Sequence, residues 1–232
     1  MTGTLKNTRV SLRPCSDYNP ANVLQSMRDC LASLGGMSAF IKPGWKTALK
    51  VNLLQGAEPE RCITTHPAII TTIAQLVREA GGIPFIVDSP GAAIPHSATH
   101  LRHIYRKCGL ADLGIELNED MEVVPLPLPE GRMIHHMQVL RPLVDADAII
   151  NLPKVKTHCF MGLTCAVKNM FGAVPGLEKL GYHSRLKSPE RFGAMLLDIL
   201  AALPPALNIV DGIEGMEGDG PSSGAPCHLG IV

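Results

Sequence analysis

Short apolar segments with the spacing of strands alternate along this chain with segments that have the spacing of helices. Residues 46–54 predict a buried strand, residues 67–80 predict a helix that ends before Gly81, and residues 83–87 predict the next strand. Strands that alternate with helices favour a parallel sheet, because each crossover carries the chain back to the same edge. We therefore expect an α/β fold, a doubly wound, mainly parallel sheet with flanking helices.

The same alternation extends over the rest of the chain. Further helices are predicted over 22–34, 97–108, 163–171 and 189–203, and further strands over 122–126, 134–140, 148–151 and 207–210. A chain of 232 residues can bury a sizeable core, and no low-complexity linker divides it, so we expect one domain over residues 1–232. Residues 228–232 have the pattern of a strand that is just beginning, which predicts that the natural chain continues past Val232.

Composition excludes several classes of protein. The chain has 21 Lys and Arg against 21 Asp and Glu, so no global basic field would attract nucleic acid or anionic lipid. Its apolar runs are too short to cross a bilayer, and no N-terminal signal pattern occurs. We expect no nucleic-acid or membrane partner and a cytoplasmic location. The seven cysteines include no CxxC pair, so their spacing predicts neither a zinc ribbon nor a ferredoxin-type cluster.

The richest candidate site is the segment 152–172, which follows the apolar residues 147–151. The ends of strands are where α/β proteins hold their ligands, and lysine suits phosphate or carboxylate. We predict that His158 and Lys156 are catalytic, His158 as an acid, base or anion-binding group. The residues predicted to bind the substrate here are Lys154, Thr157, Lys168 and Asn169. The alternative is a solvated basic loop followed by a capped helix.

Two earlier strand ends carry polar residues that could face the same crevice. Lys50 lies inside an otherwise apolar strand, where a charge is uncommon, and Asn52 follows it. Asp88 and Ser89 follow the next strand. We predict that all four bind the substrate. The alternatives are an edge strand whose lysine reaches water and an ordinary turn after the second strand.

An acidic, glycine-rich segment follows the last predicted strand. Its carboxylates are Asp211, Glu214, Glu217 and Asp219. Hard oxygen ligands of this kind suit Mg²⁺, so these four residues are a candidate metal site, although their spacing is not that of a calcium loop. A structural ion-pair network between this acidic segment and the lysine-rich segment is an equally good interpretation.

Several established motifs do not occur. The chain has no GxGxxG fingerprint and no GxxxxGK[ST] loop, which argues against the common dinucleotide and nucleotide sites. It also lacks the GxSxG motif of α/β-hydrolases.

Five segments together resemble the DUF362 family, a family of uncharacterised proteins. The segments are 50–54 (KVNLL), 88–91 (DSPG), 146–158 (ADAIINLPKVKTH), 168–172 (KNMFG) and 211–221 (DGIEGMEGDGP). The resemblance extends from Lys46 to the C-terminus. It implies an association with iron–sulfur chemistry, because many members carry a ferredoxin-like 4Fe-4S module after this domain. This chain departs from that pattern, since it has no CxxCxxC run.

Three functions follow as hypotheses. The resemblance implies a redox-linked domain, which would take electrons from a ferredoxin-like partner or an adjoining 4Fe-4S module and act on a small anionic ligand in a lysine-rich crevice. The second hypothesis is a Mg²⁺-assisted transferase or ligase that uses a phosphate or nucleotide. The third is a non-enzymatic module that binds an anion or docks a redox partner.

Overall fold

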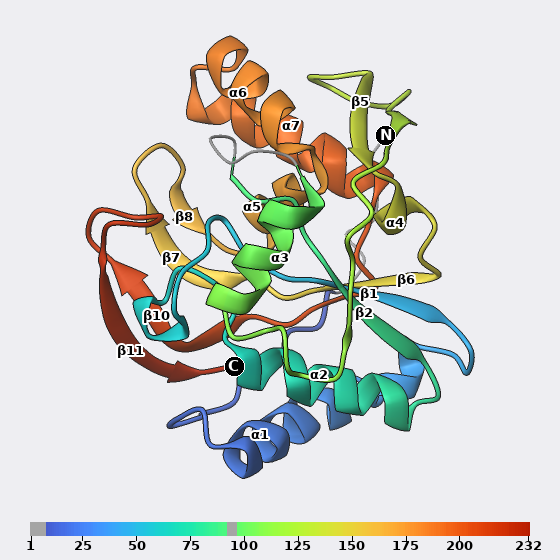
Figure 1. Ribbon diagram of the computed structural model, residues 1–232, viewed down its shortest axis with the longest axis vertical. Coiled ribbons are helices and arrows are strands. Elements are labelled where there is room, and N and C mark those ends of the chain that lie inside the picture. Colours follow the sequence, from blue (N-terminus) through green and yellow to red (C-terminus); the bar gives the residue numbers. More distant parts are fainter. Residues whose placement is uncertain (1–7, 92–96) are drawn as a thin grey trace.

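The computed structural model describes residues 8–91 and 97–232, and a parallel five-stranded sheet lies at the centre of these residues (Figure 1). Its order is β3-β2-β1-β6-β9, and each neighbouring pair is parallel. The strands are β1 (Lys46–Lys50), β2 (Ile83–Val87), β3 (Glu116–Leu117), β6 (Ala148–Asn151) and β9 (Leu207–Asn208). The predicted mixed α/β fold with a parallel sheet is confirmed.

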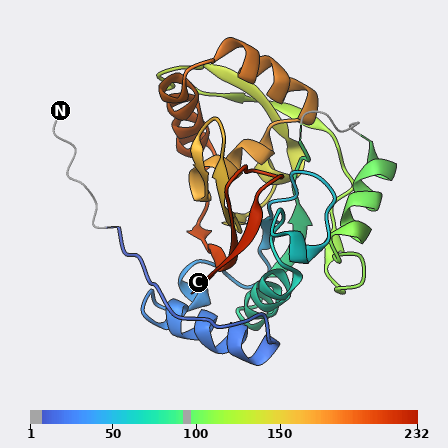
Figure 2. The ribbon, with the colours of Figure 1, turned by 90° about the vertical axis from the view of Figure 1, so that its left-hand side faces the viewer.

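Helices cover both faces of this sheet (Figures 1 and 2). One face packs against α1 (Pro20–Ala32), α2 (Pro67–Glu79) and α3 (Ala98–Lys107), and the other against α5 (Ala166–Asn169), α6 (Gly176–Arg185) and α7 (Pro189–Ala202). Successive side chains of a strand point to opposite faces, so Leu49 enters the first core and Ala48 the second. Lys50, two residues after Ala48, therefore faces the side of α5.

The ends of the main helices follow from local chemistry. Pro67 is the first residue of α2, where the missing N–H costs nothing, and His66 Nδ1 accepts a hydrogen bond from the N–H of Ala68. Beyond its last turn, Gly81 adopts φ +86°. The Ser97 hydroxyl caps α3 in the same way, by accepting from the N–H of His100. These helices lie within two residues of their predicted bounds.

A second sheet extends from the carboxyl edge of the first. Its order is β11-β10-β7-β8, and its strands are β7 (Lys154–His158), β8 (Gly162–Thr164), β10 (Asp211–Glu217) and β11 (Ala225–Ile231). Two-residue connections lead from β6 into β7 and from β9 into β10, and β7 and β10 pair in parallel.

This second sheet corrects three predictions. The lysine-rich segment and the acidic segment, in which no strand was predicted, form the neighbouring strands β7 and β10. The helix predicted over 163–171 is instead the strand β8, the short helix α5 and a 3₁₀ turn, η3 (Met170–Ala173). The sequence did not indicate strands β7 and β10, because both contain charged residues and interior strands rarely carry them.

The strands predicted over 122–126 and 134–140 form a separate antiparallel hairpin. It consists of β4 (Val123–Pro127) and β5 (His136–Leu140), and the short helix α4 (Arg141–Val144) follows it. Asp198 of α7 accepts hydrogen bonds from three backbone N–H groups just before β5. The hairpin is thereby attached to the same layer as α7. Two further 3₁₀ turns are η1 (Met37–Ala39) and η2 (Pro59–Arg61).

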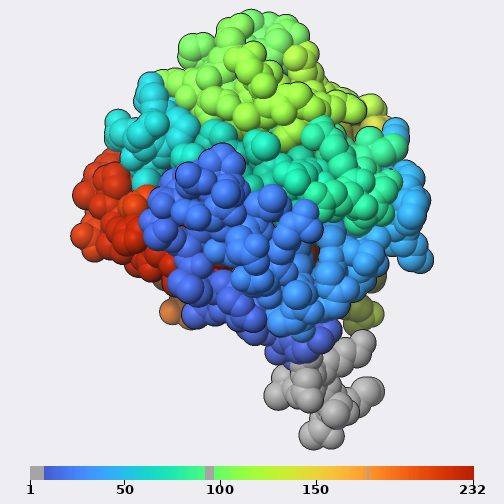
Figure 3. All heavy atoms as spheres, turned by 90° about the horizontal axis from the view of Figure 1, so that it is seen from below, coloured from blue at the N-terminus to red at the C-terminus, as the bar shows by residue number. Residues whose placement is uncertain are grey.

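The segment before α1 lies beside the last strand. Arg13 and Val232 exchange two backbone hydrogen bonds of 3.0 Å, and Pro14 bridges to Ile231. Figure 3 shows the blue residues of this segment against the red residues of the chain end. Residues 8–10 belong to no helix or strand. Within the described ranges, no helix has the length and apolar character needed to cross a bilayer.

Candidate functional site

A cavity of about 220 Å³ lies at the carboxyl edge of the central sheet, where several elements of the second layer meet it. Asn52 follows β1, and Asp88 and Ser89 follow β2; all three line the cavity. The ends of parallel strands are the expected place for a ligand in an open α/β sheet. The predicted convergence of these two strand ends is therefore found.

Strand β7 supplies a lysine and a histidine to this cavity. Lys156 and His158 are two residues apart, so they lie on one face of the strand, and both line the cavity. The side chain of Lys156 is buried, and its ammonium donates to the carbonyl of Ile63. Two of its three N–H donors have no acceptor among the described residues and are free for a ligand.

Two short helices complete the lining. Lys168 and Asn169 come from α5, and Lys179 and His183 come from α6, where four residues separate them and place them on one face. The Lys168 ammonium lies 5.1 Å from the centre of the Phe171 ring and 5.5 Å from that of Phe192. These contacts hold the amine by cation–π attraction without using its N–H donors.

Lys50 and Asp88 form an ion pair at the base of the cavity. Lys50 Nζ lies 2.7 Å from Asp88 Oδ1, and it also donates to the carbonyls of Val51 and Asn169. Asp88 accepts two further bonds, from the N–H groups of Leu53 and Ser89. Burial lowers the pKa of Lys50, and the Asp88 carboxylate opposes that shift. The two charges cancel, and Lys50 has no donor left for a substrate.

Gly172 is required where the backbone passes this ion pair. A Cβ at that position would overlap Asp88 Oδ1 and Lys50 Nζ. A residue with a side chain would have to displace buried charged atoms, which explains the glycine that ends the segment 168–172.

The cavity is electropositive because its remaining lysines have no carboxylate partner among the described lining residues. Burial lowers the pKa of Lys156 to about 7, and the charges of Lys168 and Lys154 act in the same direction. Burial lowers the pKa of Lys168 to about 8, and that of Lys179 to about 7 although Asp88 opposes the shift. An anion that entered the cavity would favour the charged form of all three amines.

His158 is held as a neutral hydrogen-bond donor. Its Nδ1 accepts from the backbone N–H groups of Phe160 and Met161, at 3.1 and 3.2 Å, so the ring proton lies on Nε2. Burial lowers the pKa of His158 to about 4, and the positive charge of Lys168 adds to the effect. The neutral ring therefore offers its Nε2–H to the cavity as a hydrogen-bond donor, and the predicted acid or base role of His158 stays a prediction.

Buried polar atoms without a partner gather at this cavity. Among the described residues six buried side-chain atoms have no hydrogen bond, and four of them belong to residues that line the cavity. They are Asn52 Oδ1, Ser89 Oγ, Thr164 Oγ1 and Asn169 Oδ1. Buried polar groups are nearly always paired, so their concentration in one place is the mark of a site that a polar ligand or water completes.

Three of the predicted substrate-binding residues do not line the cavity. Lys50 is held in its pair with Asp88, and Lys154 and Thr157 lie farther away. Lys154 pairs with Asp211 on the neighbouring strand, at 3.1 Å, and donates to the hydroxyl of Tyr18 at 2.7 Å. Neither Lys154 nor Asp211 lines the cavity. Thr157 points to the opposite face of β7, where its hydroxyl lies 3.5 Å from the carbonyl of Met216.

The four acidic residues predicted to bind Mg²⁺ do not come together. Asp211 is neutralised by Lys154, and Glu214 pairs with His228 at 2.6 Å. Asp211 and Glu217 lie at the two ends of the seven-residue strand β10. Asp219 is exposed beyond that strand. The described ranges contain no group of three His, Cys, Asp or Glu residues that could hold a metal ion. The ion-pair interpretation is the better one for Asp211.

The sequence predictions missed Lys179, His183 and Thr164. No helix was expected between residues 172 and 189, because Gly176 and Gly181 weaken its helical pattern. The signal that was available is Pro175, at the helix start, followed by a lysine and a histidine four residues apart.

Known proteins resemble this chain over most of its length. The model of the family described as "Domain of unknown function (DUF362)" matches residues 47–232. The chain belongs to the DUF362 family. A thylakoid-associated protein of Synechocystis sp. is 38% identical over 235 residues, covering 96% of this chain and 68% of the relative. The expected cytoplasmic location stays a prediction, because this relative is described by its association with thylakoids.

Two solved structures have a similar but distant arrangement. The lactate racemase apoprotein of Thermoanaerobacterium thermosaccharolyticum is 15% identical, with a TM-score of 0.45, and the match covers 87% of this chain and 51% of that protein. A protein from Thermotoga maritima is 11% identical, with a TM-score of 0.43, and the match covers 87% of this chain and 52% of that protein. The chain thus spans about half the length of these two proteins.

Proposed function

We propose that this DUF362 protein binds a small phosphorylated or carboxylated ligand in the cavity at the carboxyl edge of its central sheet. The observation that carries the proposal is that Lys156, Lys168 and Lys179 line one cavity, while the acid beside them, Asp88, is already paired with Lys50. An anion there would gain charge-assisted hydrogen bonds from amines that otherwise lack a counter-ion.

Side chains from three elements, β7, α5 and α6, would contact the anion. Lys156 on β7 is fixed by the Ile63 carbonyl and offers two N–H donors. Lys179 on α6 donates to the carbonyls of Ser89 and Pro90, at 2.6 and 2.8 Å, and offers one. Lys168 lies over two aromatic rings, and His158 offers its Nε2–H. A tetrahedral or planar anion would be held from several sides.

Calorimetric titration of the purified chain with inorganic phosphate, sulfate and small carboxylates tests this proposal. We expect at least one of these anions to bind, and Lys156→Met or Lys168→Met to weaken it roughly tenfold or more, since each removes a charge-assisted hydrogen bond. Lys187→Met is the matched control, because Lys187 is an exposed lysine just beyond α6. Equal weakening by all three variants would show only a general charge effect and would contradict the proposal.

The redox role that the family resemblance implies is a second proposal. We propose that a 4Fe-4S cluster, where one serves this protein, belongs to an adjoining or partner ferredoxin-like module. The support is that no three candidate metal ligands gather in the described part of the chain. Under anaerobic conditions, reduced ferredoxin should be reoxidised faster when the protein is present together with a bound anion that can itself accept the electrons. Binding without any such reoxidation would favour the non-enzymatic module.

The Mg²⁺-assisted transferase is the weaker alternative. The carboxylates proposed as its metal ligands are dispersed, and Asp211 is held by Lys154. This alternative would be restored if a nucleotide bound to the protein only in the presence of Mg²⁺ and did not bind to Lys156→Met.

A further inference from the structure

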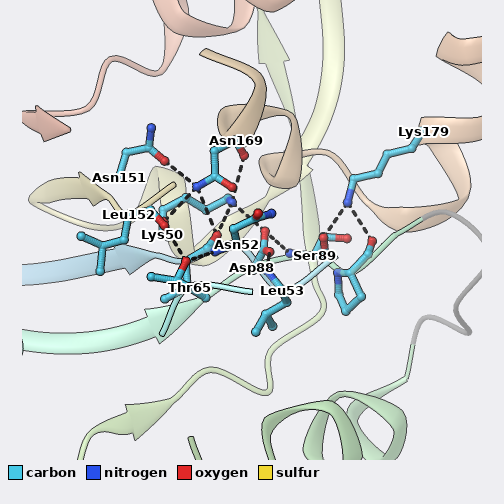
Figure 4. A network of polar contacts seen from close by, with 12 residues as sticks. Lys50, Asn52, Leu53, Thr65, Asp88, Ser89, Asn151, Leu152, Asn169 and Lys179 are labelled. Atoms are coloured by element: carbon cyan, nitrogen blue, oxygen red, sulfur yellow. Dashed lines mark hydrogen bonds and ion pairs between the residues drawn. The ribbon is translucent and has the colours of Figure 1, made fainter. Parts of the chain in front are cut away.

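The orientation of the Asn169 amide narrows the class of anion that fits the cavity. Its Nδ2 lies against three acceptors: Asn151 Oδ1 at 2.8 Å and the carbonyls of Lys50 and Val51, both at 3.3 Å (Figure 4). Turning the amide over would bring its oxygen against these three oxygens and lose every bond. The amide is therefore fixed, and Oδ1 is the atom that stays buried without a partner at the cavity.

The neighbouring amide is fixed as well. Asn151 Nδ2 donates to the carbonyl of Ala166 at 2.9 Å and to Asn208 Oδ1 at 2.8 Å. Asn151 Oδ1 must then face Asn169, and because an amide oxygen can only accept, the atom of Asn169 that meets it must be the donor Nδ2. The chain of amides from β9 through β6 to α5 leaves one possible hydrogen-bond role for Asn169 Oδ1, which is to accept from a donor in the cavity.

Sulfate and a plain dicarboxylate cannot supply that donor. They offer only acceptors, which satisfy the lysines but leave Asn169 Oδ1 unpaired, whereas inorganic phosphate near pH 7 still carries a hydroxyl. An ammonium group on the ligand would donate, but it would enter a cavity lined by Lys156, Lys168 and Lys179 and be repelled. A neutral hydroxyl can donate to Asn169 Oδ1 and carries no positive charge for the lysines to repel. Ser89 and Thr164 do not discriminate, because a hydroxyl can turn to donate or accept.

We propose that the cavity selects small anions that carry a hydroxyl group, such as hydroxycarboxylates or phosphorylated polyols, and that Asn169 is the residue that recognises the hydroxyl. This inference rests on the proposed anion site, since the lysines must first hold the charged end. It adds a specificity that the lysines alone cannot provide, because a positive cavity does not distinguish one carboxylate from another of equal charge.

The test compares ligands that differ by one hydroxyl at constant charge. Calorimetry with the full chain would measure malate, as each enantiomer, against succinate, and glycerol 3-phosphate against propyl phosphate. We expect the hydroxylated member of at least one pair to bind about tenfold tighter, because a site with a buried acceptor rejects the analogue that leaves it unpaired. Equal affinity within both pairs would overturn the inference and leave the anion site standing. No binding of any anion, phosphate and sulfate included, would overturn the proposed function itself.

Variants of Asn169 assign the preference to this residue. In Asn169→Leu, with folding checked by circular dichroism, the ratio of the two affinities within a ligand pair should fall from about ten to about one. Asn169→Asp keeps an acceptor oxygen toward the cavity but loses the three bonds of Nδ2, so it should be less stable. Where it folds, it should retain a preference for the hydroxylated member while binding both members more weakly. Thr157→Val, on the far face of β7, should leave the ratio unchanged. A preference that survives in folded Asn169→Leu would overturn the role of Asn169.

Discussion

Lys50 Nζ and Asp88 Oδ1 are 2.7 Å apart at the carboxyl ends of two neighbouring strands, and both side chains are buried. Both residues are predicted from the sequence to bind the substrate, but their charges satisfy each other. This pairing affects the charge of the cavity. Because Asp88 is paired with Lys50, it offsets the charge of Lys156 and Lys179 only in part, and the cavity keeps a positive potential.

Removing one partner of this pair should destabilise the protein. Lys50→Met leaves the Asp88 carboxylate buried without its counter-ion, and the expected loss is about 3–5 kcal/mol in the free energy of unfolding. Urea denaturation followed by circular dichroism measures it. Lys46→Met is the control on the same strand, because Lys46 is exposed; it should change the free energy by less than about 0.5 kcal/mol. A loss below about 1 kcal/mol in Lys50→Met would show that the pair contributes little.

Gly172→Ala should be destabilising because the added methyl group meets that ion pair. The Cβ would overlap Asp88 Oδ1 and Lys50 Nζ, so the loss should be about 1–3 kcal/mol in the free energy of unfolding. Gly193→Ala is the matched control in α7, where the nearest atom to a new Cβ is the end of Met161, at 3.8 Å. That change should be neutral or stabilising, because alanine favours a helix over glycine. Equal effects of the two substitutions in the same urea experiment would contradict this account.

The parts of the fold that sequence reasoning predicts well are those with local causes. The helix α2 is predictable because Pro67 and Gly81 mark its ends and its apolar residues recur at helical spacing. Strand β7 is not predictable in this way, because Lys154 and Lys156 are tolerated inside a sheet only through Asp211 and the Ile63 carbonyl. Partners so distant in the sequence leave no local signal.

The same distinction applies to the candidate site. Asn52, Ser89, Lys156 and Lys168 could be selected as site candidates, because strand ends and a lysine that interrupts apolar residues are visible in the sequence, and all four line the cavity. Lys154 and Thr157 do not, because alternation along a strand decides which neighbours share a face, and that segment is a strand rather than a loop.

Tyr18→Phe should weaken the fold without changing anion binding. The Tyr18 hydroxyl donates to Asp211 Oδ1 at 2.8 Å and accepts from Lys154 and from the Glu214 N–H, so it joins the segment before α1 to the second sheet. Its loss leaves buried groups with fewer partners, which should lower the free energy of unfolding by about 1–3 kcal/mol. Urea denaturation and sulfate titration of the same sample measure both effects. A large change in sulfate affinity would link this cluster to the cavity.

The lysines of the cavity should make stability and anion affinity depend on pH in opposite directions. In the unfolded chain these lysines would have a pKa near 10.5, against about 7 for Lys156 and Lys179 in the folded protein. Between these values the unfolded state binds more protons, so the stability of the protein without ligand should rise as the pH rises from 7 to 10. As the pH is lowered from 10 to 7 the stability should fall, because charging these buried amines costs free energy, and below pH 7 it should level off because both states then hold the protons.

Anion binding requires the charged amines, so affinity should fall over the range in which stability rises. Sulfate is the suitable probe, because its own charge stays constant from pH 6 to 9. For each lysine that must take up a proton on binding, the affinity should decrease by roughly tenfold per pH unit above that lysine's pKa. Lys156→Met should both weaken binding at pH 6 and flatten this decline, whereas Lys187→Met should leave its slope unchanged. A sulfate affinity that is constant from pH 6 to 9 would mean that the cavity lysines are fully charged throughout, and that burial does not lower their pKa as the structure indicates.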